Sequence, residues 1–424
     1  TGLGTRGGNC TFLAGGPVRS VPRDEVRQEA QAGRLAFFRV ELHGENVIPR
    51  NGAGKAERIA GSASHQILLP RIHVVAVHKI EAAAVGNAVA GLITGQECIR
   101  GQVVLREMGI GGIPGINTEN ACASSSTAFH IAWLYVAAGM YDTVLAAGME
   151  KLFHPDKKKT FTAIGSAIDL EIADEFARQM SGEQSGGAGE ARSVFMDYYA
   201  SLARQHMARY GTTREQFAQI AAKNHTNGSL NPHAQFQTPR TVADILAAPL
   251  IAEPLTRMMC SPIGDGAAAV IITTAEKARQ LTTKPVFVRA SIIGSSQEHA
   301  PDAPGIVEKT SQKAYSMAGI SPSEVQVVEV HDATAPAELL IYEELGLCPA
   351  GEGGKLIADG GTQIGGRIPV NPSGGLLAKG HPVGATGVAQ ISEIFWQLRG
   401  EAGKRQVAGA KVGPTENGGG VLGG

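Results

Sequence analysis

Hydrophobic and polar positions follow one another in regular blocks between residues 81 and 151. Short apolar runs that are typical of strands lie at 82–89, 114–120 and 141–151. Between them, residues 96–110 have helical spacing that ends at Gly109, and residues 124–140 are apolar almost all round, which is typical of a buried helix. This β-α-β-α-β order predicts a parallel or mixed sheet with helices on its faces.

A second set of blocks begins near Pro285 and repeats this order. Strand-like runs lie at 286–296 and 325–333, and helical patterns lie at 310–320 and 335–347. We therefore expect a duplicated βαβαβ core. Residues 150–240 are richer in charge and glycine and contain a helical pattern at 193–211, so they are expected to form an insertion over the sheet. After the insertion, residues 260–281 predict a turn, a buried strand and the start of a helix.

The first 80 residues lack a sustained period of 2 or 3.6 residues, apart from short pieces such as 37–42. Low order is predicted for this segment. Two interpretations remain open, an irregular or altered terminus and a small extra module. The expected domains are an atypical segment at 1–80, a first half at 81–275 that includes the insertion, and a second half at 276–424.

Composition and charge narrow the class of protein. Of 424 residues, 43% are hydrophobic, 18% are charged and 55 are glycines, as in globular α/β proteins with many tight turns. The formal net charge of −1 gives no reason to expect nucleic acid as a partner, so an anionic ligand must meet local basic groups. The absence of an apolar run of about 18 residues and of a basic-then-apolar start predicts a cytoplasmic protein without membrane insertion.

Five cysteines are spread along the chain, at Cys10, Cys98, Cys122, Cys260 and Cys348. They form no CxxC pair and have no companion histidines at the spacing of metal ligands, so neither a disulfide framework nor a metal site is expected. Most cysteines are small buried hydrophobic residues, so a reactive cysteine must be recognised by its context.

Cys122 has such a context in the segment NTENACASSSTAFH, between a predicted strand and a predicted buried helix. The three serines that follow can cap or line the turn. Backbone N–H groups and the helix dipole at a helix N-terminus lower the pKa of a thiol, which predicts an anionic sulfur near neutral pH. A buried structural cysteine beside a capped helix is the alternative.

Three further segments supply polar candidates. His381 lies in the glycine-rich segment NPSGGLLAKGHPVGATG, where its imidazole can take a thiol proton or donate to a carbonyl oxygen. His331 and Asp332 follow a predicted strand, where open α/β sheets place ligands. We expect Asp332 to cap the helix that begins near Pro336, with orientation of a histidine as the alternative. The triple glycine at 418–420 can present backbone N–H groups to an oxyanion, or form only a turn.

Together, these motifs resemble those of the thiolase superfamily. NACASSS, HDA, NPSGG with GHPVGATG, and a late GGG stand in its order and spacing over about residues 81–424. The chain looks most like the sterol-carrier-protein-type branch, which is similar to acetyl-CoA acetyltransferases. The resemblance implies an α/β thiolase fold, with two similar βαβαβ halves in a five-layer αβαβα arrangement and an inserted loop domain, usually as a homodimer.

The resemblance also implies roles for individual residues. Cys122 matches the nucleophile that becomes acylated, and His381 matches the histidine that activates it. His331 matches the first histidine of the branch's HDCF motif, which helps to hold the thioester oxygen of the second substrate. The backbone N–H groups of Cys122 and Gly418 match the pair that holds the oxygen of the acyl-enzyme.

Two positions depart from the family pattern. Thiolases use a second cysteine as acid and base, either in HDCF or in a C-terminal CxG, and this chain has Ala333 and Glu416 at those positions. Acylation of Cys122 can proceed without that cysteine, whereas removal of a proton from an acetyl-CoA methyl group lacks its usual base. Glu416 is a candidate substitute if burial raises its pKa, and the alternative is a side chain that faces solvent.

These features predict an acyl-CoA acyltransferase of lipid and acyl-CoA metabolism, which takes a coenzyme A thioester as substrate and needs no cofactor. Two alternatives remain open. One is a carbon–carbon lyase of the retro-aldol kind, often assembled with a small OB-fold partner protein. The other is a non-catalytic thiolase-like subunit that binds coenzyme A esters. The presence of Cys122, His331 and His381 together favours the acyltransferase.

Overall fold

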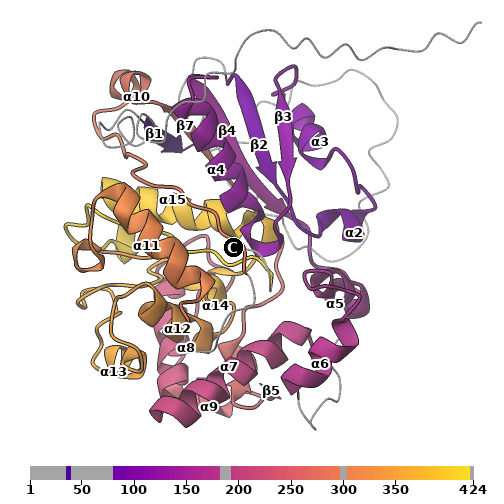
Figure 1. Cartoon of the computed structure of the whole chain (residues 1–424), viewed down its shortest axis with the longest axis vertical. Helices are drawn as coiled ribbons and strands as arrows, with labels where there is room; N and C mark the ends of the chain where they lie inside the picture. Colours follow the sequence, from indigo (N-terminus) through magenta and orange to yellow (C-terminus); the bar gives the residue numbers. More distant parts are fainter. Residues whose placement is uncertain (1–34, 40–79, 182–191, 297–302, 421–424) are drawn as a thin grey trace, which may run out of the picture.

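A computed structural model of the chain describes residues 35–39, 80–181, 192–296 and 303–420 (Figure 1). Most of the segment 1–80, for which low order is predicted, lies outside these residues. Its described part, Leu35–Arg39, is a strand. In the described ranges, no helix has both the length and the apolar character needed to cross a membrane.

One five-stranded mixed sheet forms the centre of the first half, in the order β1-β7-β4-β2-β3. Its strands are β1 (Leu35–Arg39), β2 (Ala82–Gly86), β3 (Gly115–Thr118), β4 (Thr143–Glu150) and β7 (Gly266–Thr274). Strands β4, β2 and β3 are parallel, whereas β7 is antiparallel to both β4 and β1. Every residue of β2 is buried, as expected for an apolar run covered on both faces. The predicted mixed sheet is confirmed.

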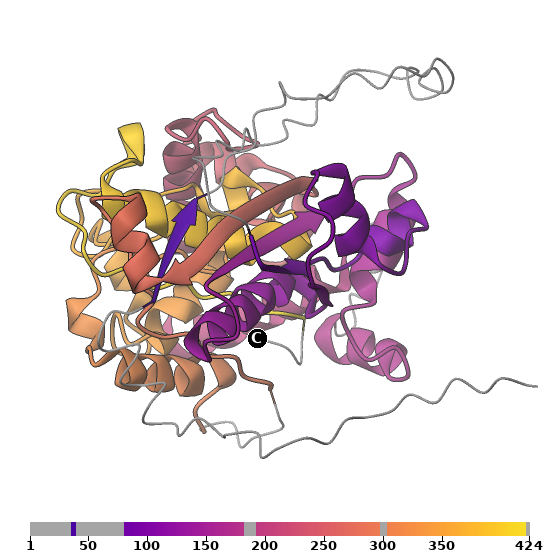
Figure 2. The ribbon, with the colours of Figure 1, turned by 90° about the horizontal axis from the view of Figure 1, so that it is seen from above.

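Helices cover both faces of this sheet (Figure 2). Helix α3 (Arg100–Glu107) packs on one face, where Leu145 of β4 belongs to its cluster of buried side chains. Helices α4 (Ser124–Ala137) and α15 (Thr386–Arg399) pack on the opposite face. Val144 of β4 points to this face, because successive residues of a strand point to opposite sides of the sheet. Helix α4 contacts both the sheet and α15, which explains why its positions are apolar almost all round.

The insertion between β4 and β7 is mainly helical and lies below the sheet in Figure 1. Its helices are α5 (Lys157–Gly165), α6 (Ala173–Ser181), α7 (Val194–Tyr210), α8 (Arg214–Ser229) and α9 (Val242–Ala247), and its hairpin strands are β5 (Leu250–Ala252) and β6 (Leu255–Thr256). The short helix α2 (Ala90–Thr94) lies outside the insertion and follows β2. Helix α7 confirms the helix predicted at 193–211. Ser193 caps its start, and Gly211, in the left-handed conformation, ends it.

The second half contains the expected helices but not the expected strands. Its helices are α10 (Ala275–Leu281), α11 (Ile306–Ala318), α12 (Ala335–Glu344), α13 (Gly353–Ala358), α14 (Gly375–Lys379) and α15. The structure differs from the prediction at 286–296, which is not a strand, and at 325–333, which makes only single bridges such as Val328 with Val370. The apolar pattern at 325–333 correctly indicated burial, but a ladder also needs a continuous partner strand.

Two glycines let neighbouring segments come close to the sheet. A Cβ atom on Gly86 of β2 would lie 2.4 Å from the backbone nitrogen of Ser125 in α4. A Cβ atom on Gly148 of β4 would lie 2.5 Å from the Cβ atom of Ser125 and 2.8 Å from the Cα atom of Ala385. No side chain fits at these distances. The absence of one at Gly148 therefore allows the start of α4 and the segment before α15 to meet over β4.

We predict that Gly148→Ala destabilises the protein, because its methyl group has no space between β4, α4 and the segment before α15. Overpacking of this kind typically lowers the free energy of unfolding by about 1–3 kcal/mol. Urea unfolding followed by circular dichroism measures the change. Gly111→Ala is the matched control, because a Cβ atom there meets nothing within 4 Å. Equal stability of the two variants would contradict this account.

Candidate active site

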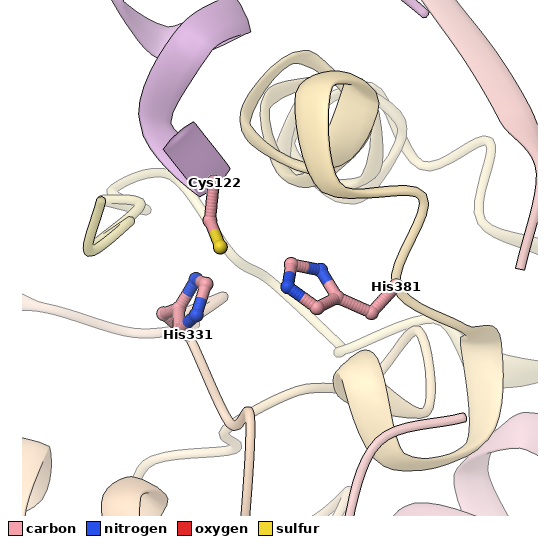
Figure 3. Close-up of side chains that lie close together, drawn as sticks. All are labelled: Cys122, His331 and His381. Atoms are coloured by element: carbon pink, nitrogen blue, oxygen red, sulfur yellow. The ribbon is translucent and has the colours of Figure 1, made fainter. Parts of the chain in front are cut away.

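Cys122 lies in a short 3-10 turn, Ala121–Ala123, between β3 and α4 (Figure 3). The hydroxyl group of Ser124 closes the turn, because it accepts the N–H of Asn120 at 2.9 Å and donates to the carbonyl oxygen of Ala121 at 2.7 Å. Ala121 has a φ angle of 43°, in the left-handed region that non-glycine residues rarely adopt. The predicted position of Cys122, before a buried helix and in a turn bonded by a serine, is confirmed.

His381 lies between α14 and α15, and its ring points toward Cys122 and His331 (Figure 3). Its Nδ1 atom lies 2.8 Å from Oγ1 of Thr386, whose hydroxyl group donates to the carbonyl oxygen of Pro382 at 3.1 Å. Because the Thr386 proton is used in this way, Oγ1 accepts the Nδ1–H of His381. The Nε2 atom is then the unprotonated nitrogen, and it is the one directed at the other two side chains.

His331 directly follows the buried segment 327–330 and lies next to the His381 ring. The two rings meet edge to face, with centroids 5.1 Å apart and an interplanar angle of 87°. The Nδ1 atom of His331 lies 2.9 Å from Nδ2 of Asn417, and Oδ1 of Asn417 accepts a hydrogen bond from the hydroxyl group of Ser126 in α4. Both ends of the Asn417 amide are therefore engaged.

The structure brings three of the predicted side chains together. One atom each of Cys122, His331 and His381 lies within 4.8 Å of the other two. Cys260 lines the same cavity as Cys122. A thiol and two imidazoles can also bind a zinc ion, so these are the residues that would hold a metal, and the expectation of a metal-free site stays a prediction.

Burial determines the protonation of the Cys122 thiol. Its pKa is raised to about 12, mainly because burial disfavours the thiolate. The backbone N–H groups of Gly420 and Cys122 oppose this rise, and the carboxylates of Glu150 and Glu119 add to it. The prediction of an anionic sulfur near neutral pH is therefore wrong, because burial at this turn outweighs the effect of the helix N-terminus.

The two histidines are uncharged for the same reason. Burial and, to a smaller extent, the nearby cation of Lys379 lower the pKa of His331 to about 4. Burial also holds the pKa of His381 well below its ordinary value of 6.5, with contributions from His331 and Lys379. The resting cluster therefore consists of a neutral thiol beside two neutral imidazoles.

Glu416 and Gly418 both lie near the cluster, but only Gly418 lines the cavity of Cys122. Oε2 of Glu416 accepts the backbone N–H of His331 at 2.9 Å, and burial raises the pKa of this carboxyl group to about 7. Glu416 lines a separate cavity of about 1070 Å³ and not the cavity of Cys122. Gly418 lines both cavities, and a backbone N–H that contacts the sulfur belongs to Gly420.

The cavity that contains the three side chains has a volume of about 960 Å³. Ala333 also lines it, at the position of the HDCF cysteine. Its lining includes basic side chains from several segments, namely Arg100, Lys157, Arg240 and Arg257. A space of this size accommodates a small-molecule ligand, and these charges favour an anionic one.

Asp332 connects the segment of His331 with the segment of His381. Its carboxylate accepts the backbone N–H groups of Leu376 at 2.6 Å and Leu377 at 3.2 Å, so it caps α14, the helix that precedes His381. Thr334 caps α12 instead. The prediction that Asp332 caps the helix near Pro336 is therefore wrong, because Asp332 caps a helix more than 40 residues away.

Sequence analysis missed three residues that support the cluster, namely Glu150, Thr386 and Asn417. Thr386 lies inside the motif GHPVGATG, so the motif itself was the available signal. Glu150 accepts the N–H groups of Val89 at 3.2 Å and Gly384 at 2.9 Å, and it thereby links β4 to the segment after His381. No local pattern marks Glu150 or Asn417, because their partners are distant in the sequence.

Comparisons with known proteins agree with these motifs. The family described as "Thiolase, N-terminal domain" matches residues 55–276, and "Thiolase C-terminal domain-like" matches residues 295–423. The acetyl-CoA acetyltransferase of Methanothermobacter thermautotrophicus is 43% identical over 349 residues, which cover 81% of this chain and 86% of that protein. Sterol carrier protein 2 of Homo sapiens is 36% identical over 355 residues, so that the chain spans 62% of its length.

Solved structures share the fold. A structure described as an Ltp2-ChsH2(DUF35) aldolase has a TM-score of 0.63 at 23% identity, over 81% of this chain and 85% of that chain. Human mitochondrial 3-ketoacyl-CoA thiolase has a TM-score of 0.56 at 17% identity, over 81% of this chain and 86% of that chain. The α/β thiolase fold class is thereby confirmed. With both family domains matched and a relative at 43% identity, this chain belongs to the thiolase family.

Proposed function

We propose that the protein is an acyl-CoA acyltransferase that carries the acyl group on the sulfur of Cys122. The pairing of a neutral thiol with the bare Nε2 atom of His381 carries the proposal, because a thiol with a pKa of about 12 needs a neighbouring base to attack a thioester. The basic side chains of the 960 Å³ cavity suit the phosphate groups of coenzyme A. The relative named acetyl-CoA acetyltransferase supports this substrate class.

The first half-reaction acylates Cys122. The thiol proton moves to Nε2 of His381 while the sulfur attacks the carbonyl carbon of the thioester. When the tetrahedral intermediate collapses, the bond to the coenzyme A sulfur breaks, and His381 returns the proton to that sulfur. The backbone N–H groups of Cys122 and Gly418 are the proposed donors to the oxyanion, and that of Gly420 is a further candidate because it contacts the sulfur. Each donor typically contributes about 3–4 kcal/mol.

The second half-reaction transfers the acyl group to an acceptor. With coenzyme A as acceptor, its thiol gives a proton to His381 and its sulfur attacks the acyl-cysteine carbonyl carbon. Collapse breaks the bond to the Cys122 sulfur, which takes the proton back. When the acceptor is instead a second acyl-CoA, His331 is the proposed hydrogen-bond donor to the thioester oxygen of that second substrate, since its ring lies beside His381 in the same cavity.

Carbon–carbon condensation needs an additional base, because a weakly acidic α-proton must be removed. Ala333 lines the cavity at the position of one usual cysteine and has no group that can take a proton. Glu416, at the other position, lines the separate cavity. We therefore infer that acyl transfer to a thiol is the better supported reaction of this site.

A second candidate function is carbon–carbon cleavage of the retro-aldol kind on a coenzyme A ester. The likeness to the Ltp2-ChsH2(DUF35) aldolase favours it, and an OB-fold partner protein belongs to this alternative. The intact Cys122 and His381 pair favours acyl transfer, because retro-aldol cleavage does not require an acyl-cysteine. A covalent adduct on Cys122 separates the acyltransferase from the lyase and from a non-catalytic binding subunit.

A homodimer is the proposed assembly. Strand β3 is the last strand of the sheet, and its Ile116 is 37% exposed, so a second copy can pair along this edge. The cytoplasmic location stays a prediction.

We predict that incubation with acetyl-CoA or a longer acyl-CoA adds one acyl group to the protein, on Cys122. Intact-mass spectrometry with peptide mapping detects it. Cys122→Ala should abolish the adduct, and the matched control Cys260→Ala, in the same cavity, should retain it. Prior treatment with a chelator should leave the adduct unchanged. An adduct on Cys98, Cys260 or Cys348 would refute the assignment.

We predict that acylation keeps its rate on the acid side of neutrality. Because burial holds the pKa of His381 well below 6.5, its Nε2 stays unprotonated to a greater extent at about pH 5.5 than that of an ordinary histidine, which is about nine-tenths protonated there. Between about pH 8 and about pH 5.5, single-turnover acylation should therefore lose clearly less than the roughly tenfold expected of an ordinary histidine base. A roughly tenfold loss at the lower pH would mean that the base titrates like an exposed histidine.

The variant His381→Ala completes this experiment. Loss of the base should slow acylation by about 10²–10⁴-fold and slow alkylation of Cys122 by iodoacetamide as well. Unchanged alkylation with lost turnover would instead assign His381 to oxyanion binding.

We predict measurable acyl exchange between the enzyme and coenzyme A but acetyl-CoA condensation at least about 100-fold slower. Ala333→Cys should raise condensation by supplying the missing base, whereas Ala333→Ser, of similar size, should not. Radiolabel exchange and acetoacetyl-CoA absorbance measure the two rates. Wild-type condensation as fast as exchange would show that another group is the base, and loss of that condensation in Glu416→Gln would identify Glu416.

A further inference from the structure

Two chemically identical rings face the same substrate cavity, and their Nδ1 atoms have different partners. On His381, Nδ1 meets a hydroxyl oxygen whose own proton goes to the Pro382 carbonyl oxygen. That oxygen accepts, so His381 carries its proton on Nδ1. Because both rings are buried and neutral, each has one ring proton, and its position decides whether Nε2 donates or accepts.

On His331, Nδ1 meets the amide nitrogen of Asn417 at 2.9 Å. An amide nitrogen donates only, so Nδ1 of His331 accepts and its proton lies on Nε2. The orientation of the amide follows from Ser126, whose hydroxyl group donates to Oδ1 of Asn417. In this orientation Oδ1 accepts the Ser126 proton and Nδ2 faces Nδ1 of His331.

The surroundings leave little space for another arrangement. A Cβ atom on Gly387 of α15 would lie 2.0 Å from Oγ of Ser126 and 2.7 Å from Oδ1 of Asn417. The backbone of α15 therefore closes over this hydrogen bond. Ser126 also lies one turn after Cys122, so the chain from Ser126 through Asn417 to His331 connects the nucleophile's helix to the second histidine.

We propose that Asn417, oriented by Ser126, is a positioning residue that keeps the His331 proton on Nε2, so that His331 only donates to the substrate oxygen while His381 acts as the base. The proposal rests on the proposed acyl transfer. It deepens that function, because an Nε2 that already carries a proton cannot remove an α-proton from a second acyl-CoA. Two histidines in one cavity thus have separate roles, set by the donor or acceptor beside each Nδ1.

Asn417→Asp tests the proposal, since a carboxylate accepts where the amide donates. At about pH 8.5, where both imidazoles are uncharged, the variant should move the His331 proton to Nδ1. Two-bond ¹⁵N–¹H couplings in ¹⁵N-histidine-labelled protein distinguish the two tautomers, and His331→Gln identifies the signals. Loss of the donor should slow acetyl-CoA condensation in the Ala333→Cys background by about 100-fold or more, while acylation of Cys122 and its reverse, transfer to coenzyme A, stay close to the wild-type rates.

Ser126→Ala is the second variant, because the freed amide can turn and should give mixed tautomers with a smaller loss of condensation in the same background. Ser392→Ala is the matched control, since that hydroxyl group of α15 donates to the carbonyl oxygen of Val388 in its own helix. A wild-type His331 with its proton on Nδ1, or Asn417→Asp with unchanged condensation, would overturn the proposal. If the wild type forms no acyl-cysteine, the proposed function fails, and the spectra still decide the tautomer.

Discussion

Burial of Cys122, His331 and His381 in one cluster is the constraint on which the rest of the site depends. In water the three groups would titrate at their ordinary pKa values, but here the charged forms are disfavoured, so the thiol keeps its proton and both rings stay neutral. Reactivity then cannot come from a resting thiolate. In the proposed acyl transfer it comes from proton transfer during attack, which makes the position of each proton decisive.

That constraint explains the polar residues around the cluster. Buried polar atoms need hydrogen-bond partners, and the hydrogen bonds around this cluster also connect two segments of the fold. Glu150 joins β4 to the segment after His381, and Asp332 joins the His331 segment to α14. Glycines complete the arrangement, because the missing side chain on Gly148 lets α4 and the segment before α15 meet over the sheet. Geometry at the sulfur thus depends on contacts between both halves of the chain.

The same arrangement bears on the chemistry. A base, a nucleophile and oxyanion donors are sufficient to move an acyl group between two thiols, and the groups proposed for these roles are His381, Cys122 and the backbone N–H groups of Cys122 and Gly418. Condensation requires one more proton acceptor in the cavity, to remove the α-proton of the second acyl-CoA. The two family positions that would supply it hold Ala333, which has no such group, and Glu416, which lines the other cavity. These two positions therefore favour the proposed acyl transfer over carbon–carbon bond formation.

Sequence alone determined the features that depend on local pattern. Apolar periodicity predicted α4, α7 and the buried strands β2 and β4, and the motifs located Cys122, His331 and His381. Tertiary structure decided what depends on distant partners. In the structure, residues 286–296 form no strand, and Asp332 caps α14. Glu416 lines a different cavity from Cys122, and burial raises the pKa of the Cys122 thiol to about 12. Strand pairing and the Ser126–Asn417–His331 hydrogen bonds connect residues that are far apart in the chain, and desolvation depends on which distant residues surround a group. No local sequence pattern therefore encodes them.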